Sequence, residues 1–498
     1  MLPEQVRHNC GVAVTHTLHD AYAFIKSLQH RGRDAVGIAA VGNGTIDVVK
    51  WIGKVETVDL VDLHKLLPSP NYHTYLAHVR YATKGSKREL LADAHPHVIG
   101  GDAHDYGSHH IIRGCEAAAI HNGHIEDLFL QHPDADSGAD SGAESGAAPL
   151  LPTSSCDTER LLHLYRQVGE REVLRRVPGA YLVAIADARN DHVIVLRDRT
   201  GIRPGVLGLK DGKHVVASED IALRKNGADF IEDLDLGSVY RLAADGDYEK
   251  ELVVDPAPAH CFFEWNYIAD RDSIVEGLYV KKLRRALGEM LAEELDLDSI
   301  DYISYFPRAP EDAARGMVRA SGKQFRPLFY KLRGERAFQG PTPGERAESI
   351  STNIYLIPDL VPAIDGRRLL VVDDSIVRGN NMRHERVLLS KVGIGGATKA
   401  LYTPPIGVAG EDGVERGCLF GIDMPPDDDF YARGRTLEEM RDDEEGSIVY
   451  LTVDGMLEAF ERLGMPRSRL CTYCIGGPHP YAAIPDLELP QRLAPAGA

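Results

Sequence analysis

Short apolar runs separated by polar segments fill the first half of the chain, and their length is typical of β-strands. Four such runs cover residues 37–41, 74–79, 181–186 and 193–196. A stretch with helical spacing over residues 159–168 interrupts them. Strands that alternate with helices predict a domain of layered α and β elements.

The second half of the chain follows a more regular order of helix, strand, helix, strand and helix. The pattern predicts a helix over residues 279–294 and a strand over residues 302–306. It also predicts an apolar strand over residues 367–374, with a helix from about Met382. This alternation is typical of a doubly wound parallel sheet.

Changes in composition mark the borders of these parts. Residues 253–259 are rich in proline and alanine, so we expect one domain over residues 10–250 and another over residues 260–498. Residues 134–149 repeat Ser, Gly and Ala with Asp and Glu, which predicts a low-complexity insertion. Residues 1–9 form a short polar leader, which we expect to be removed.

The charge balance excludes several classes of partner. The 498 residues contain 56 Lys and Arg against 75 Asp and Glu, giving a formal net charge of −19, which repels nucleic acid and anionic membranes. No apolar run approaches the roughly 18 residues of a membrane-spanning helix, and the start lacks a signal-peptide pattern. Seven cysteines without such a signal argue against a disulfide framework. We therefore expect a cytoplasmic enzyme with small-molecule substrates.

Cys10 is a candidate N-terminal nucleophile. It follows the polar leader and precedes an apolar run from Val12 to Val14. Removal of the leader gives this residue a free α-amine with a pKa of about 7.7–8.0, beside a thiol with a pKa of about 8.5. The amine then takes the thiol proton, and no separate histidine is needed. The alternative is a small buried cysteine beside a first strand.

Four further residues suit the hydrolysis of an amino-acid amide. Arg80 fits a substrate α-carboxylate, and Asp157 fits an α-ammonium group. Asn122 and the main-chain N–H of Gly123 fit an oxyanion. Each residue also has an ordinary interpretation: a surface arginine, a helix N-cap or an Asn-Gly turn.

In this order and spacing the residues resemble the class II glutamine amidotransferases, which have the N-terminal-nucleophile hydrolase fold. The strings from His78 to Thr83 and from Ser155 to Glu159 carry part of the resemblance, which covers residues 10–245. It implies an αββα domain with Cys10 as the nucleophile.

A candidate phosphate site follows the apolar strand of the second half, which ends in the carboxylates of Asp373 and Asp374. The loop after them leads into a helix and holds four further candidate ligands: Ser375, Arg378, Gly379 and Asn380. Ligands bind beyond the carboxyl ends of parallel strands, and a helix N-terminus offers N–H groups to phosphate. Adjacent carboxylates suit ribose hydroxyls, directly or through Mg²⁺. The alternative is an acidic turn that caps the helix.

Residues 371–379 resemble the phosphoribosylpyrophosphate (PRPP) motif of type I phosphoribosyltransferases. A class II glutaminase ahead of this motif is similar to the amidophosphoribosyltransferases, also called glutamine PRPP amidotransferases, along almost the whole chain. The resemblance implies that ammonia from glutamine attacks C1 of PRPP, giving 5-phosphoribosylamine, glutamate and pyrophosphate in the first step of de novo purine synthesis. It also implies a homo-oligomer, expected to be a tetramer.

Four cysteines form a candidate metal site. Cys471 and Cys474 make a C-x-x-C pair, which alone suits zinc, redox chemistry or coincidence. One branch of the family carries a 4Fe–4S cluster, and the resemblance places its ligands at Cys261, Cys418, Cys471 and Cys474. Four thiolates also suit structural Zn²⁺. Cys115 and Cys156 are expected to be ordinary thiols.

Two loops depart from the pattern of the family. The pyrophosphate loop reads Phe306 to Glu311, and the flexible loop that contains the candidate PRPP ligands Lys331 and Arg333 is one residue shorter. Two alternatives to a working amidophosphoribosyltransferase therefore stay open. One is an amidotransferase that acts on another phosphorylated acceptor, and the other is a non-catalytic regulator that binds PRPP.

Overall fold

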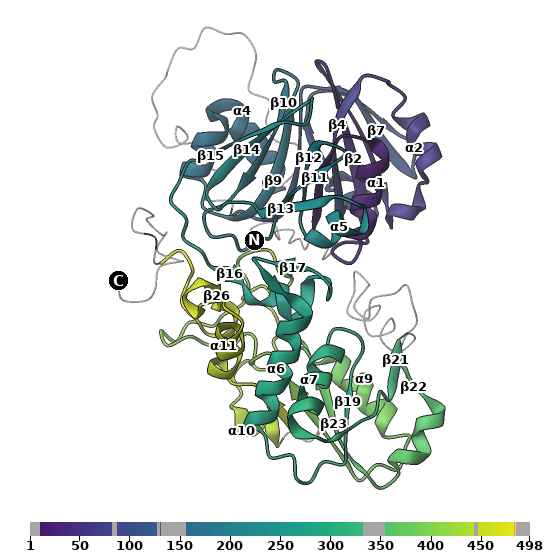
Figure 1. Ribbon diagram of the computed structural model, residues 1–498, viewed down its shortest axis with the longest axis vertical. Helices are drawn as coiled ribbons and strands as arrows, with labels where there is room; N and C mark the ends of the chain where they lie inside the picture. Colours follow the sequence, from purple (N-terminus) through teal and green to yellow (C-terminus); the bar gives the residue numbers. More distant parts are fainter. Residues whose placement is uncertain are drawn as a thin grey trace. The chain divides into compact units, whose positions relative to one another are not determined.

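The computed structural model describes residues 10–81, 87–126, 130, 156–331, 354–442, 447–482 and 484, without the side chains of residues 87–89. The predicted leader, the predicted insertion and Arg333 lie outside the described residues. The chain divides into two compact units (Figure 1). Unit 1 comprises Met1–His260 with Leu419–Asp423, and unit 2 comprises Cys261–Cys418 with Met424–Ala498.

A nine-stranded antiparallel sheet forms one layer of unit 1, in the order β13-β11-β12-β1-β4-β2-β3-β7-β6. Its strands are β1 (Gly11–Thr15), β2 (Ala35–Gly42), β3 (Thr45–Ile52), β4 (Tyr72–Arg80), β6 (Asp102–Asp105), β7 (His109–Cys115), β11 (Val206–Lys210), β12 (Lys213–Ala217) and β13 (Asp229–Asp233). Strand β4 lies between β1 and β2, with Gly11 opposite Val79 and Ala35 opposite Arg80. This register brings the start of β1 beside the end of β4.

A six-stranded antiparallel sheet forms the second layer, in the order β15-β14-β10-β9-β8-β5. Its strands are β5 (His97–Ile99), β8 (Ala117–His124), β9 (Ala180–Asp187), β10 (His192–Arg197), β14 (Ser238–Ala243) and β15 (Tyr248–Leu252). Val12 and Val14 of the first sheet share a buried cluster with Ile120 and Leu182 of this one, so the two sheets pack face to face.

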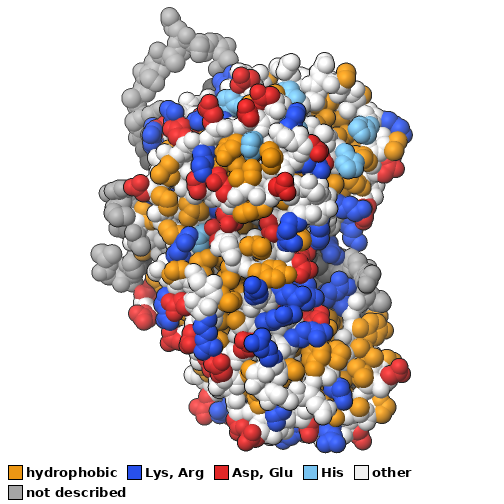
Figure 2. All heavy atoms as spheres, viewed as in Figure 1, with side chains coloured by type: hydrophobic (Ala, Val, Ile, Leu, Met, Phe, Trp, Pro, Cys, Tyr) orange, Lys and Arg blue, Asp and Glu red, His pale blue; other side chains and the backbone are white. Residues whose placement is uncertain are grey.

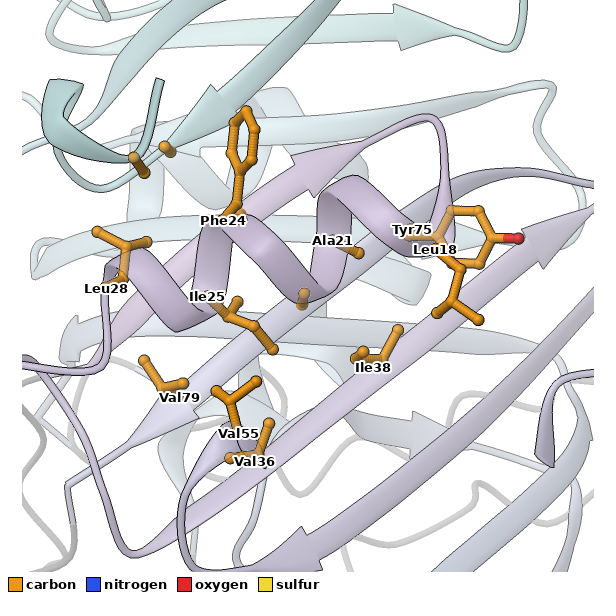
Figure 3. Close-up of a cluster of buried hydrophobic side chains, with 14 of the residues drawn as sticks. Leu18, Ala21, Phe24, Ile25, Leu28, Val36, Ile38, Val55, Tyr75 and Val79 are labelled. Carbon is orange, nitrogen blue, oxygen red and sulfur yellow. The ribbon is translucent and has the colours of Figure 1, made fainter. Parts of the chain in front are cut away.

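Helices cover the outer faces of both sheets. They are α1 (Leu18–Ser27), α2 (Leu60–Leu66), α3 (Lys87–Ala92), α4 (Asp157–Arg176) and α5 (Asp220–Lys225), with a 3₁₀ turn at Val55–Thr57. Ile25 of α1 points toward Val36 and Val79 on the outer face of the nine-stranded sheet (Figure 3), and Phe24 belongs to the same buried cluster. Helix α4 packs in the same way on the six-stranded sheet. The predicted αββα layering is confirmed.

Unit 2 is built on five parallel strands in the order β20-β19-β23-β24-β25. The strands are β19 (Tyr302–Tyr305), β20 (Gln324–Phe325), β23 (Arg368–Asp373), β24 (Gly396–Leu401) and β25 (Ser447–Tyr450). The chain adds its second strand on one side of β19 and its third on the other side. The doubly wound sheet is thus confirmed, and its switch point lies between β19 and β23, where such sheets bind ligands.

Helices and three short strand pairs complete unit 2. The helices are α6 (Val280–Glu294), α7 (Glu311–Ser321), α9 (Asn380–Leu389), α10 (Leu437–Arg441) and α11 (Val453–Arg462), with a π-helical turn at Glu264–Ile268 and 3₁₀ turns at Pro358–Ile364, Arg467–Arg469 and Tyr473–Ile475. The pairs are β16 (His260–Cys261) with β26 (Leu470–Cys471), β17 (Ile274–Val275) with β18 (Leu278–Tyr279), and β21 (Phe329–Lys331) with β22 (Ile354–Leu356). No described helix has the length and apolarity needed to cross a membrane.

Two glycines let α6 and α7 approach each other closely. A Cβ atom at Gly288 would lie 1.8 Å from the main-chain oxygen of Ala313, and one at Gly316 would lie 2.0 Å from that of Arg285. Main-chain atoms cannot move aside as a flexible side chain does. The contact between these helices therefore requires glycine on both of them.

We predict that Gly316→Ala lowers the free energy of unfolding by about 2 kcal/mol or more, because overpacking outweighs the gain in helix propensity of about 1 kcal/mol. Denaturant unfolding followed by circular dichroism measures the change. Ala320→Gly, at an exposed position of the same helix, is the matched control for propensity and should cost at most about 1 kcal/mol. A stabilised Gly316→Ala variant would contradict the close packing.

Candidate active site

Cys10 stands immediately before β1, and its side chain is fully buried. Its main-chain nitrogen donates a hydrogen bond to Oδ1 of Asn122, at 3.2 Å. Asn122 lies in β8, so this bond joins the two sheets of unit 1. The atom that would become the free α-amine thus already has an acceptor.

Burial raises the pKa of the Cys10 thiol to about 12, although a hydrogen bond with the Tyr81 main chain and the charges of Arg80, Arg203 and Arg31 oppose this effect. A thiol with so high a pKa is protonated at neutral pH, and only the thiolate is a good nucleophile. Cys10 therefore needs a base within reach.

A buried ion pair fixes the backbone at Cys10. Arg31 donates from Nε to the main-chain oxygen of Cys10, at 2.8 Å, and from Nη1 to Oε1 of Glu219, at 2.5 Å. Nε2 of His30 lies 2.7 Å from the same carboxylate oxygen. The sequence interpretation assigned no role to Arg31 or Glu219, because residues 188 positions apart give no local signal of their pairing.

The Asn122-Gly123 pair combines a buried side-chain donor with a closely packed main chain. Nδ2 of Asn122 is buried and has no hydrogen-bond partner. Gly123 has a φ of +148°, and a Cβ atom there would lie 1.7 Å from the main-chain oxygen of Ala180. Glycine is therefore required beside a side-chain donor that is free to bind a negative oxygen.

Arg80, the last residue of β4, is fully buried. It donates to the main-chain oxygen of Leu90, at 3.1 Å, and its Nη2 lies 3.3 Å from Oδ2 of Asp93. The register of β4 with β1 brings this guanidinium into the surroundings of Cys10, where its charge acts on the thiol. The predicted carboxylate ligand therefore sits beside the predicted nucleophile.

Asp157 begins helix α4 and is surrounded by donors. Its Oδ2 accepts from the main-chain nitrogen of Ile125, at 3.0 Å, and lies 3.4 Å from Nδ1 of His124. Burial would raise the pKa of Asp157, but His121 and His124 outweigh burial and hold the pKa well below its usual range. Burial would likewise lower the pKa of His124, but Asp157 and Glu126 raise it to about 9. At neutral pH the Asp157 carboxylate therefore already has a cationic partner in His124, which the sequence interpretation did not foresee.

In unit 2, the two predicted carboxylates stand at the end of β23, at the switch point of the sheet. Oδ2 of Asp373 lies 2.8 Å from Nζ of Lys399, which also pairs with Glu385. Oδ2 of Asp374 accepts from Ser375 Oγ, at 2.7 Å. Burial and the charge of Asp373 raise the pKa of Asp374 well above its usual value. A cation bound beside Asp374 would therefore stabilise the ionised form of this carboxylate.

The loop after Asp374 leads into α9. Gly379 is its N-cap with a φ of +79°, so the helix begins at Asn380, two residues before the predicted start. Arg378 donates from Nε to Oδ1 of Asp428, at 3.0 Å. Lys331 ends β21, while Arg333 is outside the described part of the chain. The continuous segment of residues 373–380 thus lies between the end of β23 and the N-terminus of α9.

The four predicted metal ligands are buried thiols of unit 2. Burial raises the pKa of Cys474 well above its usual value, and the charges of Cys418, Cys261 and Cys471 raise it further. Charges act on one another in this way only at short range. The fold therefore gathers four cysteines from three distant parts of the sequence.

Comparisons with known proteins identify the family. A model of the glutamine amidotransferase domain matches residues 150–251. The amidophosphoribosyltransferase of Archaeoglobus fulgidus is 30% identical over 480 residues, which cover 94% of this chain and 95% of the relative. The chain belongs to the amidophosphoribosyltransferase family.

Other members and a solved structure agree. The amidophosphoribosyltransferase of Mycobacterium tuberculosis is 30% identical over 502 residues, which cover 95% of this chain and 84% of that protein. The glutamine PRPP amidotransferase from B. subtilis, solved in complex with ADP and GMP, superposes with a TM-score of 0.74 at 24% identity, covering 95% of this chain and 97% of the other. The structural likeness shows that the family fold is retained.

Basic side chains are prominent on the surface of unit 2 (Figure 2). Lys and Arg side chains gather over α6 and α7 of this amidophosphoribosyltransferase family member (Figure 2). Arg315 pairs with Glu311, at 2.9 Å, and Arg319 lies 3.6 Å from Glu289. These two arginines form surface ion pairs, Arg315 within α7 and Arg319 with α6.

We predict that Glu219→Gln lowers the free energy of unfolding by about 3–5 kcal/mol, because it leaves the buried Arg31 guanidinium without its carboxylate. Thermal and denaturant unfolding measure the loss. The matched control is Glu458→Gln, which removes an exposed ion pair with Arg462 at 2.8 Å and should cost less than about 1 kcal/mol. Equal effects of the two substitutions would contradict the structural role of the buried pair.

Proposed function

We propose that the chain is a working amidophosphoribosyltransferase: unit 1 hydrolyses glutamine, and unit 2 adds the released ammonia to C1 of PRPP. The products are glutamate, 5-phosphoribosylamine and pyrophosphate, in the first step of de novo purine synthesis. Family membership supports the reaction. The observation that carries the proposal for this chain is the 3.2 Å contact between the Cys10 nitrogen and Asn122, with the Asn122 donor left available.

In the glutamine half-reaction, removal of residues 1–9 would free the α-amine of Cys10. The amine takes the thiol proton while Sγ bonds to the amide carbon of glutamine. Nδ2 of Asn122 and the N–H of Gly123 stabilise the negative oxygen that forms. The C–N bond then breaks, ammonia leaves with the proton, and water hydrolyses the thioester to glutamate.

Arg80 and Asp157 are proposed to hold the α-carboxylate and α-ammonium groups of glutamine. Each is already paired, Arg80 with Asp93 and Asp157 with His124. Substrate must therefore share or replace these partners. The existing pairs keep both buried charges satisfied when no glutamine is bound.

In the transfer half-reaction, Asp373 and Asp374 are proposed to bind the ribose hydroxyls of PRPP and Mg²⁺. Two carboxylates beside substrate oxygens are the ligands that Mg²⁺ prefers, and the ion would offset charge on the leaving pyrophosphate. Main-chain N–H groups from Ser375, Gly379 and Asn380 suit the ribose phosphate at the start of α9. Arg378, Lys331 and Arg333 would add positive charge.

The four cysteines of unit 2 are proposed to hold a 4Fe–4S cluster. The four buried thiols lie close enough for the charges of Cys418, Cys261 and Cys471 to act on Cys474, which suits a shared metal centre. The resemblance to the iron–sulfur branch of the family favours a 4Fe–4S cluster over structural Zn²⁺. A homo-oligomer, a tetramer by family resemblance, and a cytoplasmic location complete the proposal.

Anaerobically purified protein mixed with glutamine, PRPP and Mg²⁺ tests the proposed reaction. We expect glutamate and pyrophosphate to appear in equal amounts. Glutamate without pyrophosphate would favour another phosphorylated acceptor, which the unusual loop at residues 306–311 keeps as the second candidate. Binding of PRPP with no turnover would instead favour a regulator.

We predict that Cys10→Ala lowers the glutamine-dependent rate by about 10³-fold or more, because the nucleophile is lost. Synthesis from added ammonia should continue, since unit 2 does not use the thiol. Cys115→Ala removes another buried thiol and is the control, with both rates retained. Equal loss of both rates in Cys10→Ala would contradict the two-site scheme, and Met1 detected by intact-mass analysis of active enzyme would contradict the α-amine mechanism.

We predict that the anaerobic protein is brown and carries about four iron atoms per chain, as a 4Fe–4S cluster requires. Iron analysis and visible absorption measure both properties. Cys474→Ser should lose most of the iron, whereas Cys115→Ser should keep it. A colourless wild-type protein loaded with zinc would overturn the cluster assignment.

A further inference from the structure

A second group of metal-binding side chains lies inside unit 1, far in sequence from the four cysteines. His95, His97 and Cys156 offer one ligand atom each, and these three atoms all lie within 4.8 Å of one another. The three side chains are buried, with at most 4% of any of them exposed. Sequence pattern alone predicts an ordinary thiol at Cys156 and no role for either histidine.

The histidine rings are oriented as metal ligands usually are. In protein metal sites, a ligating imidazole almost always bonds a second group through its other ring nitrogen. Nε2 of His95 lies 2.8 Å from Oγ1 of Thr158, which leaves Nδ1 as its other nitrogen. His97 hydrogen-bonds the main chain of Asp93, while its buried Nε2 has no hydrogen-bond partner. A buried nitrogen without a partner is costly in an empty site.

We propose that His95, His97 and Cys156 bind a zinc ion within unit 1. Two imidazoles and one thiolate are nitrogen and sulfur donors of the kinds that Zn²⁺ binds, and one further ligand would complete a tetrahedral site. Tetrahedral bonds of about 2.0–2.3 Å separate ligand atoms by roughly 3.3–3.8 Å, so the three atoms need only small shifts. Binding exchanges the S–H bond of Cys156 for an S–Zn bond and releases the proton to water.

The position of the trio gives the ion a structural role. His97 begins β5, and His95 follows Asp93, the partner of Arg80, by two residues. Cys156 is the N-cap residue of α4 and directly precedes Asp157. One ion would thus tie the segment beside Arg80 to the helix that carries Asp157. Asp157 directly follows the zinc ligand Cys156, and Asp93, which pairs with Arg80, lies two residues before the zinc ligand His95.

The test measures the metal directly and does not depend on the proposed reaction. Protein expressed with added zinc is purified, and its zinc is counted by mass spectrometry. We expect about one Zn²⁺ per chain in wild type and in Cys474→Ser, because the latter alters only the four-cysteine site. Cys156→Ser and His97→Gln should weaken zinc binding by about 100-fold or more, since even loss of an outer partner costs about 10–100-fold. Cys115→Ser, another buried thiol of unit 1, should keep the ion.

X-ray absorption at the zinc edge gives an answer that needs no variant. We expect one sulfur at about 2.3 Å and nitrogen ligands at about 2.0–2.1 Å. A shell of sulfur alone would assign the zinc to the four cysteines and overturn the proposal. Zinc that disappears in Cys474→Ser but persists in Cys156→Ser would overturn it as well, as would wild-type protein with no zinc.

Discussion

The position of β4 between β1 and β2 is the constraint on which the proposed glutamine site depends. Antiparallel pairing sets Gly11 opposite Val79, so the residue before β1 and the residue after Val79 meet at one edge of the sheet. Those residues are Cys10 and Arg80. Tyr75, Ala77 and Val79 of β4 pack in one buried cluster and Leu76 packs in another, so a slip of one residue would exchange the side chains of two different cores. The hydrophobic core thus determines which thiol meets which guanidinium.

Both candidate sites keep their charges in buried pairs. Arg31 meets Glu219 in unit 1, and Lys399 meets Asp373 in unit 2. A buried pair contributes little net stability compared with apolar packing, but loss of one partner leaves an uncompensated charge at a cost of several kcal/mol. The main effect of these pairs is therefore to fix the positions of the backbone segments that carry them, and their contribution to net stability is small. This explains how Cys10 and Asp373 are held in place before substrate arrives.

The features that could be predicted from the sequence are those that a local pattern of residues determines. Strands of both units, the loop at residues 373–380 and the four gathered cysteines were visible because each has a local spacing or a family motif. The pairing of Arg31 with Glu219, of His124 with Asp157 and of His97 with Cys156 was not visible. These partners are between 33 and 188 residues apart, and only the tertiary fold of unit 1 brings them together. An isolated histidine in a sequence has no preferred meaning until its neighbours in space are known.

The segment Leu419–Asp423 shows why unit 1 is not simply the first half of the chain. Nη2 of Arg203 donates to the main-chain oxygen of Phe420, at 2.8 Å, and a Cβ atom at Gly421 would lie 3.0 Å from the main-chain oxygen of Gly123. The segment therefore packs against the residue proposed to stabilise the oxyanion. Cys418, a proposed cluster ligand, directly precedes this segment in the chain. One peptide bond therefore joins a proposed cluster ligand to a segment of unit 1 that lies beside the proposed oxyanion donor, and glycine at residue 421 permits the close approach to Gly123.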